Sequence, residues 1–252
     1  MFSVAHLKYA MGEKNILNVD LAEANSGDFI ALLGTNGAGK STFLKSMTGE
    51  LMASGSVSFY GRAREQWNRQ ALAKQLAVLP QASELSFPFT AQEVVELGLI
   101  PLSYKQQDGI RVVRESMQKT SVWDLADRLY SLLSGGERQR VHLARVLVQL
   151  SQASEPPILL LDEPTSAQDL AQQHDILSLL KQLCDEQQWC VVAIVHDLNQ
   201  ALRFCNRTWL IHDSELIAEG APEQVLNLDT IEKVWGYRGQ LLRTDDQQLV
   251  FI

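Results

Sequence analysis

The sequence contains few cysteines and no long run of apolar residues. Its three cysteines, Cys184, Cys190 and Cys205, are odd in number and lack the spacing of metal ligands. We therefore expect reduced thiols, as in the cytosol, and neither a disulfide framework nor a cysteine metal site. The longest apolar runs, 158–161 and 191–195, fall far short of the roughly 20 residues that a membrane-spanning helix needs.

Positive charge is also scarce, because 22 lysines and arginines stand against 30 aspartates and glutamates, a formal net charge of −8. This balance argues against nucleic acid or an anionic lipid surface as the main partner, so any membrane contact is expected to pass through another protein. The first residues show no basic region followed by an apolar segment, so no signal peptide is predicted. A chain of 252 residues is long enough to bury the core of one domain with an appended subdomain.

A glycine-rich stretch at 34–42, GTNGAGKST, matches the phosphate-binding pattern G-x-x-x-x-G-K-[ST]. An apolar run at 28–33 precedes it and apolar residues at helical spacing follow, so we expect a strand, a tight turn and a helix that starts near Lys40. Glycines let consecutive backbone N–H groups point at one anion, and the positive end of the helix adds to that site. Here Lys40 would reach the β- and γ-phosphates of a nucleotide, and the Ser41 hydroxyl would ligate Mg²⁺.

Two acidic residues, Asp162 and Glu163, follow the apolar run 158–161. Carboxylates at the end of a buried strand are costly unless something there uses them. In a chain with a phosphate loop, Asp162 would hold the Mg²⁺ shell and Glu163 would take a proton from an attacking water. The alternative is a strand end that is simply solvated.

Two further polar residues stand at predicted strand ends. Gln81 comes shortly after the buried run 76–79, and His196 directly follows the buried run 190–195. Ligands bind at the carboxyl ends of the strands in open α/β sheets, so both side chains are candidates for the same site.

Other features are weaker when taken alone. The stretch 134–136, Ser-Gly-Gly, precedes a helical pattern and is either a second anion site or an ordinary helix cap. Residues 1–28 form short alternating segments around a turn, which is typical of antiparallel strands. Tyr9, beside that turn, would stack on a nucleotide base or cover the edge of the sheet. From about residue 82 to 133 helical patterns predominate, which indicates an inserted helical subdomain.

The order of six motifs along the chain resembles that of the ATP-binding subunits of ABC transporters. The motifs are the phosphate loop, the strand-end Gln, Leu-Ser-Gly-Gly-Glu, apolar-Asp-Glu, Ser-Ala-x-Asp and the strand-end His. The resemblance covers essentially the whole chain. By position, the Walker A loop corresponds to Gly34–Thr42, the Q-loop glutamine to Gln81 and the signature to Ser134–Glu137. The Walker B motif corresponds to Ile158–Glu163, the D-loop to Ser166–Asp169 and the switch histidine to His196. It implies an α/β fold with a P-loop NTPase (RecA-like) core at 1–81 and 134–252, an antiparallel β layer, and a helical subdomain at about 82–133.

The resemblance also implies a role for each residue of the site. Glu163 would be the catalytic base, assisted by Lys40 and by His196 on the γ-phosphate. Mg²⁺ would be bound by Ser41, Gln81 and Asp162. The residues implied in ATP binding are Tyr9, Gly34, Asn36, Gly37, Ala38, Gly39, Lys40, Ser41, Thr42, Gln81, Ser134, Gly135, Gly136 and Glu137. The register leaves Met11 as an alternative to Tyr9 for contact with adenine.

The assembly implied by the resemblance is a head-to-tail homodimer, in which Lys40 of one copy faces residues 134–136 of the other with ATP between them. Two transmembrane permease subunits and a periplasmic substrate-binding protein would complete the transporter. The chain would then lie on the cytoplasmic face of the inner membrane and touch the membrane only through the permease. No nucleic-acid partner is expected.

The segments Leu79–Gln81, Phe87–Thr90 and Glu93–Gly98 are similar to those of haem-import members of the family. The residues from His196 to Leu202 are similar to a broader group that imports haem, iron–siderophore complexes and cobalamin. The expected function is ATP-driven haem uptake, with uptake of ferric siderophore or cobalamin as the alternative. A soluble ABC ATPase of DNA repair or translation is a remoter alternative, because the chain has one cassette, no long coiled-coil insertion and no basic surplus.

Three positions depart from the common family pattern: Thr35 replaces proline, Glu137 replaces glutamine and Gln168 replaces leucine. An acid such as Glu137 suits the start of a helix, where it complements the dipole. Gln168 would loosen the packing of the D-loop without removing a catalytic group. Phe87 and Phe89, on either side of a proline, form an apolar knob that is either a docking surface for a membrane partner or a corner of the core.

Overall fold

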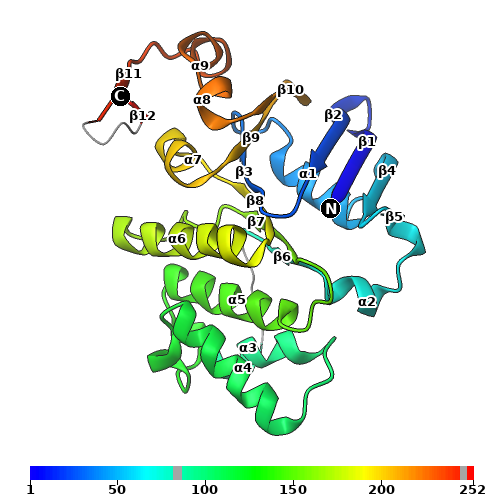
Figure 1. The fold of residues 1–252 in the computed structure, drawn as a ribbon, viewed down its shortest axis with the longest axis vertical. Coiled ribbons are helices and arrows are strands. Elements are labelled where there is room, and N and C mark those ends of the chain that lie inside the picture. Colours follow the sequence, from blue (N-terminus) through cyan, green and yellow to red (C-terminus); the bar gives the residue numbers. More distant parts are fainter. Residues whose placement is uncertain (82–86, 245–248) are drawn as a thin grey trace. The chain divides into compact units, whose positions relative to one another are not determined.

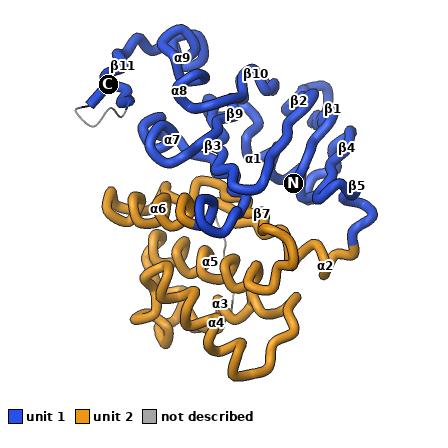
Figure 2. The backbone as a smooth tube through the Cα atoms, viewed as in Figure 1, with its two compact units in different colours: residues 1–67, 183–252 blue, residues 68–182 orange. Residues whose placement is uncertain are grey.

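The computed structural model describes residues 1–81, 87–244 and 249–252 and contains both helices and β-sheet (Figure 1). The chain forms two compact units (Figure 2). Unit 1 comprises residues 1–67 and 183–252, and unit 2 comprises residues 68–182. The helical subdomain predicted at about 82–133 falls within unit 2, and its first residues, 82–86, lie outside the described residues. Its division from the predicted core at 1–81 and 134–252 stays a prediction.

Unit 1 contains a mixed sheet in the order β5-β4-β1-β2-β10-β9-β3-β8. Its strands are β1 (Phe2–Met11), β2 (Lys14–Ala24), β3 (Phe29–Leu33), β4 (Ser54–Phe59), β5 (Arg62–Ala63), β8 (Cys190–Ile194), β9 (Arg207–His212) and β10 (Glu215–Gly220). β1 pairs antiparallel with β2 and β4, which confirms the antiparallel layer predicted for residues 1–28. β3 runs parallel to β8 and β9, so the chain leaves all three strands at the same edge of the sheet.

An aromatic cluster forms part of the core of unit 1. α1 (Lys40–Thr48) places Phe43 edge-on to Trp209 of β9, with ring centroids 5.8 Å apart. Phe2 of β1 meets the same indole at 6.0 Å, and Trp209 is fully buried. β3 is buried along its whole length, as its apolar sequence predicts. The cluster therefore joins the antiparallel layer, the parallel strands and the helix that follows the phosphate loop.

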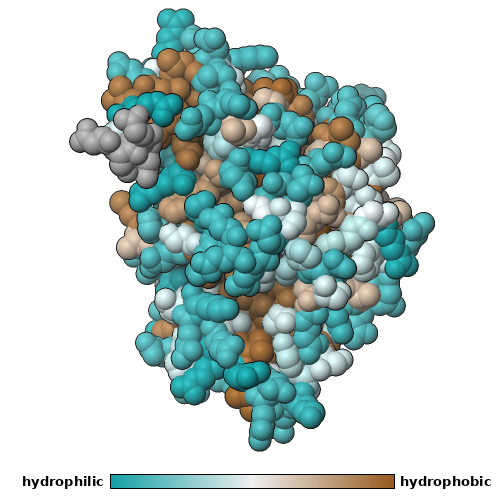
Figure 3. All heavy atoms as spheres, in the orientation of Figure 1, coloured by the Kyte–Doolittle hydropathy of each residue, from teal (hydrophilic) through white to brown (hydrophobic). Residues whose placement is uncertain are grey.

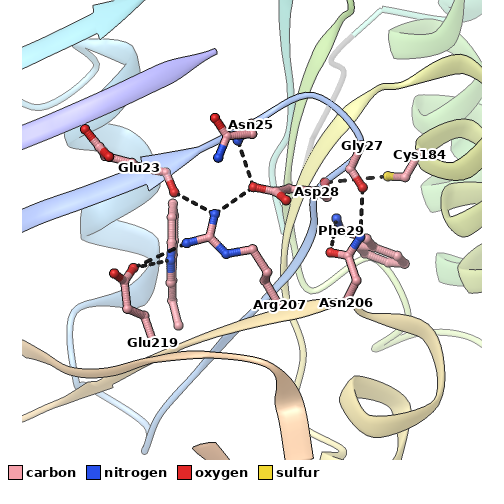
Figure 4. Close-up of polar contacts among 10 residues, drawn as sticks. Glu23, Asn25, Gly27, Asp28, Phe29, Cys184, Asn206, Arg207 and Glu219 are labelled. Carbon is pink, nitrogen blue, oxygen red and sulfur yellow. Dashed lines mark hydrogen bonds and ion pairs between the residues drawn. The ribbon is translucent and has the colours of Figure 1, made fainter. Parts of the chain in front are cut away.

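Polar contacts anchor the start of β3, the strand that leads to the phosphate loop (Figure 4). The Arg207 guanidinium donates to the Asp28 carboxylate at 2.7 Å. The side chain of Asn206 accepts from the Phe29 N–H at 2.9 Å and donates to the Gly27 carbonyl at 2.8 Å. Asn206 directly precedes β9 and Arg207 begins it, so these bonds hold the start of β3 against its parallel neighbour.

The C-terminal part of unit 1 holds α7 (Leu198–Phe204), α8 (Pro222–Val225), α9 (Leu228–Trp235), and the hairpin of β11 (Leu241–Arg243) and β12 (Leu249–Phe251). No pattern noted in the sequence indicates the terminal hairpin. Asn199 of α7 fixes β12, because its amide donates to the Phe251 carbonyl at 3.0 Å and accepts from the Phe251 N–H at 2.8 Å. Local patterns do not reveal a contact between residues so far apart in sequence.

Unit 2 combines a short parallel sheet with a group of helices. β6 (Leu76–Leu79) and β7 (Ile158–Asp162) pair in parallel. The helices are α2 (Arg69–Ala73), α3 (Ala91–Glu96), α4 (Gln106–Lys119), α5 (Gly135–Leu150) and α6 (Leu170–Gln187), whose last residues belong to unit 1. Single 3₁₀ turns lie at Arg64–Gln66 in unit 1 and at Leu97–Leu99, Trp123–Leu125 and Tyr130–Leu132 in unit 2.

α3, α4 and α5 share one apolar core in unit 2. Val94 of α3, Val113 of α4 and Val141 of α5 are all buried in it. Gly98, just after α3, lies so close to α5 that a Cβ there would overlap the Arg145 carbonyl. This close approach explains why the turn at the end of α3 carries glycine.

Within the described ranges, no helix is both long and apolar enough to cross a membrane. Hydrophilic side chains predominate on the face shown in Figure 3. Several large apolar residues of unit 2 are nevertheless well exposed, among them Leu170 at 85%, Ile100 at 75%, Phe87 at 69% and Leu132 at 68%.

Candidate active site

The phosphate loop of unit 1 has the predicted form, with β3 before it and α1 after it. Gly34 and Gly39 have φ angles of 147° and 106°, in the left-handed region that favours glycine. A Cβ at Gly34 would overlap the Ile211 carbonyl, and one at Gly39 would lie 2.6 Å from the Ile16 carbonyl oxygen. Neither position accepts a side chain, so the packing of the chain itself requires these glycines.

Lys40 is buried at the start of α1, with 7% of its surface exposed. Its ammonium donates to the carbonyls of Gly34 at 2.8 Å and Thr35 at 2.9 Å. Asn36 and Gly37, at the tip of the loop, are exposed. The positive charge is thus fixed on the loop backbone, next to the part of the loop that a phosphate group can reach.

The register of the sheet brings His196 to the same edge as the phosphate loop. β3 and β8 are parallel neighbours with Leu32 opposite Ile194. Gly34 and His196 each lie two residues beyond this pair, and the His196 side chain is exposed. Unit 1 therefore brings together two of the predicted elements, the Walker A loop and the switch histidine.

The other strand-end residues meet in unit 2. Leu79 of β6 stands opposite Leu161 of β7, and Gln81 and Glu163 each lie two residues further on. The Gln81 amide donates to Glu163 Oε2 at 2.9 Å. Asp162, the last residue of β7, is buried. The predicted Q-loop glutamine and catalytic base are therefore direct hydrogen-bond partners.

Glu163 has an unusual backbone conformation for a residue with a side chain. Its φ is 54°, in the left-handed region, which costs of the order of 1–3 kcal/mol outside glycine. Its carbonyl accepts from Gln139 Nε2 at 2.6 Å, from the Ser166 N–H at 3.3 Å and from Ser166 Oγ at 3.1 Å. Gln139 lies on α5, and the sequence analysis does not single it out. The signal that could have drawn attention to it is its position, one turn into the helix that follows the signature.

The signature residues form the N-terminal cap of α5. Ser134 Oγ accepts from the Glu137 N–H at 3.3 Å, and the Glu137 carboxylate accepts from the Ser134 N–H at 2.7 Å. This reciprocal cap is a capping box of the S-x-x-E type. The bond from the Ser134 backbone, helped by the Arg128 guanidinium 3.5 Å away, lowers the pKa of Glu137. Glu137 thus serves the helix start, as expected for an acid at this position.

Gln168 does not loosen the D-loop, contrary to the expectation from its replacement of leucine. Its side chain is buried, with 8% of its surface exposed. Its amide donates to the Gly136 carbonyl at 2.8 Å and accepts from Arg140 at 2.7 Å. Hydrogen bonds to α5 therefore take the place of the apolar packing that a leucine would make.

Both residues considered for contact with adenine lie near the end of β1. Tyr9 is half-buried and pairs with Leu17, directly before a bulge in the strand. Met11 pairs with Lys14 at the hairpin turn and is 66% exposed. The assignment of either residue to adenine stays a prediction.

The residues predicted to bind Mg²⁺ all offer oxygen donors: the Ser41 hydroxyl, the Gln81 amide and the Asp162 carboxylate. A hard cation prefers such donors, and Mg²⁺ in phosphate-handling sites is usually held by one or two carboxylates together with phosphate oxygens. The chemistry of this donor set fits Mg²⁺. In the part of the chain that the structure describes, no group of three His, Cys, Asp or Glu side chains forms a metal cluster.

The two phenylalanines of the apolar knob have different surroundings. Phe89 is partly buried against the core of α3, α4 and α5, whereas Phe87 is 69% exposed. Their ring centroids are 6.0 Å apart. Phe89 is therefore a corner of the core, and only Phe87 remains available as a surface contact.

Comparison with known proteins places these features in one family. The sequence pattern of the ABC transporter family matches residues 17–166, which is more than half of the chain. The hemin import ATP-binding protein HmuV of Shewanella denitrificans is 46% identical over 100% of this chain and 100% of its own length. The protein of the same name from Vibrio cholerae is 50% identical over 90% of this chain and 88% of its own length.

Solved structures agree with this placement. A transporter assigned to the metal-chelate ABC type, in an inward-facing conformation, matches with a TM-score of 0.80 at 26% identity, over 100% of this chain and 97% of the matched chain. A dimeric ATP-binding cassette in a post-hydrolysis state, bound to ADP and phosphate, matches with a TM-score of 0.77 at 29% identity, over 88% of this chain and 99% of the matched chain. With the ordered motifs and the strand-end residues described in each unit, these matches establish that the chain belongs to the ABC transporter family.

Proposed function

We propose that this chain is the ATP-hydrolysing subunit of a bacterial haem importer. The observation that carries the hydrolytic part is the 2.9 Å hydrogen bond between Gln81 and Glu163 at the ends of two parallel strands, in a chain that also has a phosphate loop. The choice of haem is supported by the relatives from Shewanella denitrificans and Vibrio cholerae, which are named as hemin import ATP-binding proteins.

ATP binding would use the phosphate loop of unit 1. The Lys40 ammonium, now bonded to the carbonyls of Gly34 and Thr35, would exchange these partners for β- and γ-phosphate oxygens and so remain paired. Ser41, Gln81 and Asp162 would hold Mg²⁺, which neutralises the charge that develops on the phosphates. Tyr9 or Met11 would contact adenine.

Hydrolysis would need little covalent chemistry from the protein. Glu163 takes the proton of a water whose oxygen attacks the γ-phosphorus in line, while the bond to the bridging oxygen breaks and ADP leaves. Gln81 orients the Glu163 carboxylate, and His196 donates a hydrogen bond to the γ-phosphate. Rate enhancement then comes from positioning and from charge stabilisation.

The active assembly would be a head-to-tail homodimer. Each chain has two candidate anion sites, the phosphate loop in unit 1 and the capped N-terminal turn of α5 at residues 134–136 in unit 2. In the homodimer, Lys40 of one copy faces residues 134–136 of the other across ATP. The similarity to a dimeric cassette bound to ADP and phosphate supports this arrangement.

The complete importer would include two transmembrane permease subunits and a periplasmic substrate-binding protein, with this chain on the cytoplasmic face of the inner membrane. Phe87 is a candidate for a permease contact, because it is a large apolar side chain that is 69% exposed beside a packed core. Ferric siderophore or cobalamin is the alternative cargo, since the chain is also similar to a transporter of the metal-chelate type.

The test is the ATPase of the transporter reconstituted with its binding protein, measured with haem, a ferric siderophore or cobalamin. We expect haem to stimulate turnover. Glu163→Gln should still bind ATP but lose turnover by about 10²–10⁴-fold, the usual contribution of a general base. Glu155→Gln, at an exposed residue before β7, is the matched control and should keep its activity.

Stimulation by cobalamin or siderophore, and not by haem, would overturn the cargo while leaving the ATPase in place. Wild-type turnover in Glu163→Gln would remove Glu163 from its role.

A further inference from the structure

Gln168 links the D-loop to the first turns of α5, entirely within unit 2. Its Nε2 donates to the Gly136 carbonyl at 2.8 Å and to Gln139 Oε1 at 3.1 Å, and its Oε1 accepts from Arg140 at 2.7 Å. A primary amide has two N–H donors, so both are used. One buried side chain therefore bonds three positions of the same helix.

The backbones of the two segments also approach closely. A Cβ at Gly136 would lie 2.7 Å from the Ala167 carbonyl oxygen, closer than a real Cβ can come. The D-loop and α5 consequently form one packed contact, and the bonds of Gln168 lie inside it.

Gln139 continues this contact to the proposed base. Its Oε1 accepts from Gln168, and its Nε2 donates to the Glu163 carbonyl at 2.6 Å. If the Gln139 amide rotated by half a turn, its NH₂ would face the NH₂ of Gln168 and its oxygen would face the Glu163 carbonyl. Both contacts would then be repulsive, so the bond from Gln168 selects the orientation in which Gln139 supports Glu163.

We propose that Gln168 is a positioning residue for hydrolysis. By fixing the amide of Gln139, it stabilises the left-handed backbone of Glu163, from which the carboxylate meets Gln81. This inference rests on the proposed role of Glu163 as the base. It gives the Gln168 position a function in turnover, although Gln168 itself is not placed against the nucleotide.

The test compares two substitutions at Gln168 with a matched control on α6. Gln168→Leu keeps about the same volume but removes every hydrogen bond, and Gln168→Glu keeps the acceptor for Arg140 while turning an oxygen toward two other oxygens. We expect either change to lower kcat of the full chain about tenfold or more, because a small misplacement of a catalytic group has such effects. KM for ATP should change less than kcat, because Gln168 bonds to the Gly136 carbonyl of the signature but does not bond to the phosphate loop.

Gln172→Leu is the control, since Gln172 also accepts from Arg140 but has no bond to Gly136 or Gln139. It should leave kcat within about twofold of wild type, because it leaves the bonds of Gln168 to Gly136 and Gln139 in place. A purely structural role for Gln168 would lower the melting temperature without separating kcat from KM.

The double variant decides whether Gln168 acts through Gln139. Gln139→Leu should lower kcat, and adding Gln168→Leu should lower it by less than about twofold more, because residues of one network are not additive. Factors that multiply would overturn the inference, as would wild-type kcat in Gln168→Leu or, if that variant does not fold, in Gln168→Glu. If the Gln168 variants keep the wild-type kcat while Glu163→Gln is inactive, only this inference fails. If Glu163→Gln is active, the proposed function on which the inference rests fails as well.

Discussion

Replacing Gly136 by alanine tests how tightly the D-loop packs on α5, and Gly135→Ala is the matched control. A Cβ at Gly136 would lie 2.7 Å from the Ala167 carbonyl oxygen and 3.0 Å from Gln168 Oε1. At Gly135 the nearest atom would be the Ala167 Cβ at 3.6 Å, an ordinary van der Waals distance. Both glycines lie in the first turn of α5, so the gain in helix propensity is similar for the two variants.

These distances set the expected magnitudes. Alanine in place of glycine favours a helix by roughly 0.5–1 kcal/mol, and at Gly135 nothing opposes this gain. At Gly136 the new methyl group must push the D-loop backbone away, and overpacking of this kind costs about 1–3 kcal/mol. We therefore expect Gly136→Ala to be destabilised by roughly 1–2 kcal/mol, which for a chain of this size lowers Tm by roughly 2–8 °C. Gly135→Ala should keep or slightly raise Tm.

The measurement is thermal unfolding of the three proteins at pH 7, followed by calorimetry or circular dichroism. Stability separates the packing role from the proposed contact with the partner's nucleotide, which would make both variants poor ATPases. The reasoning fails if Gly135→Ala is destabilised as much as Gly136→Ala. It fails equally if Gly136→Ala melts with the wild-type protein.

Two further predictions concern unit 2. Phe87→Ala should leave Tm and the basal ATPase within error of wild type but lower transport in the assembled complex. Phe89→Ala should lower Tm, because Phe89 packs on the helical core. Equal effects of the two changes on Tm would contradict this prediction. Burial, together with the Arg145 guanidinium, lowers the pKa of His142 to about 4, so the unfolded chain takes up that proton first. Stability should therefore fall as pH drops from about 6.5 to about 4, by on the order of 3 kcal/mol. His142→Leu should remove this component, and identical pH profiles of unfolding for the two proteins would exclude it.

The parts of the fold that the sequence predicts depend on residues close together along the chain. The phosphate loop follows from an apolar strand, glycines and a helix start within about 20 positions. α7 (Leu198–Phe204) starts from an equally local signal, because Asp197 caps it by accepting from the Asn199 N–H at 2.8 Å. The capping box at Ser134 and Glu137 is equally local.

The contacts that position Glu163 depend on residues far apart and could not be predicted. Gln139 lies 24 positions from Glu163 and Gln81 lies 82 positions away. The positions of Gln81 and Glu163 at strand ends predicted that they share a sheet edge. The hydrogen bond between them could not be predicted, because the side-chain geometry depends on the register of β6 and β7. For Gln168, the departure from the family pattern was visible, but its effect depended on the donors and acceptors that α5 presents to it.

The strain at Glu163 indicates how the two copies of the proposed homodimer would influence each other. A left-handed backbone costs of the order of 1–3 kcal/mol, and each hydrogen bond to the Glu163 carbonyl contributes about 0.5–1.5 kcal/mol against it. One of these bonds comes from Gln139 on α5, the helix whose first turn would face Lys40 of the other copy. A shift of α5 as the copies close or separate would therefore change the support of the base in the same chain. In the proposed homodimer, turnover by Glu163 of one chain would then depend on whether nucleotide is bound against residues 134–136 of that same chain.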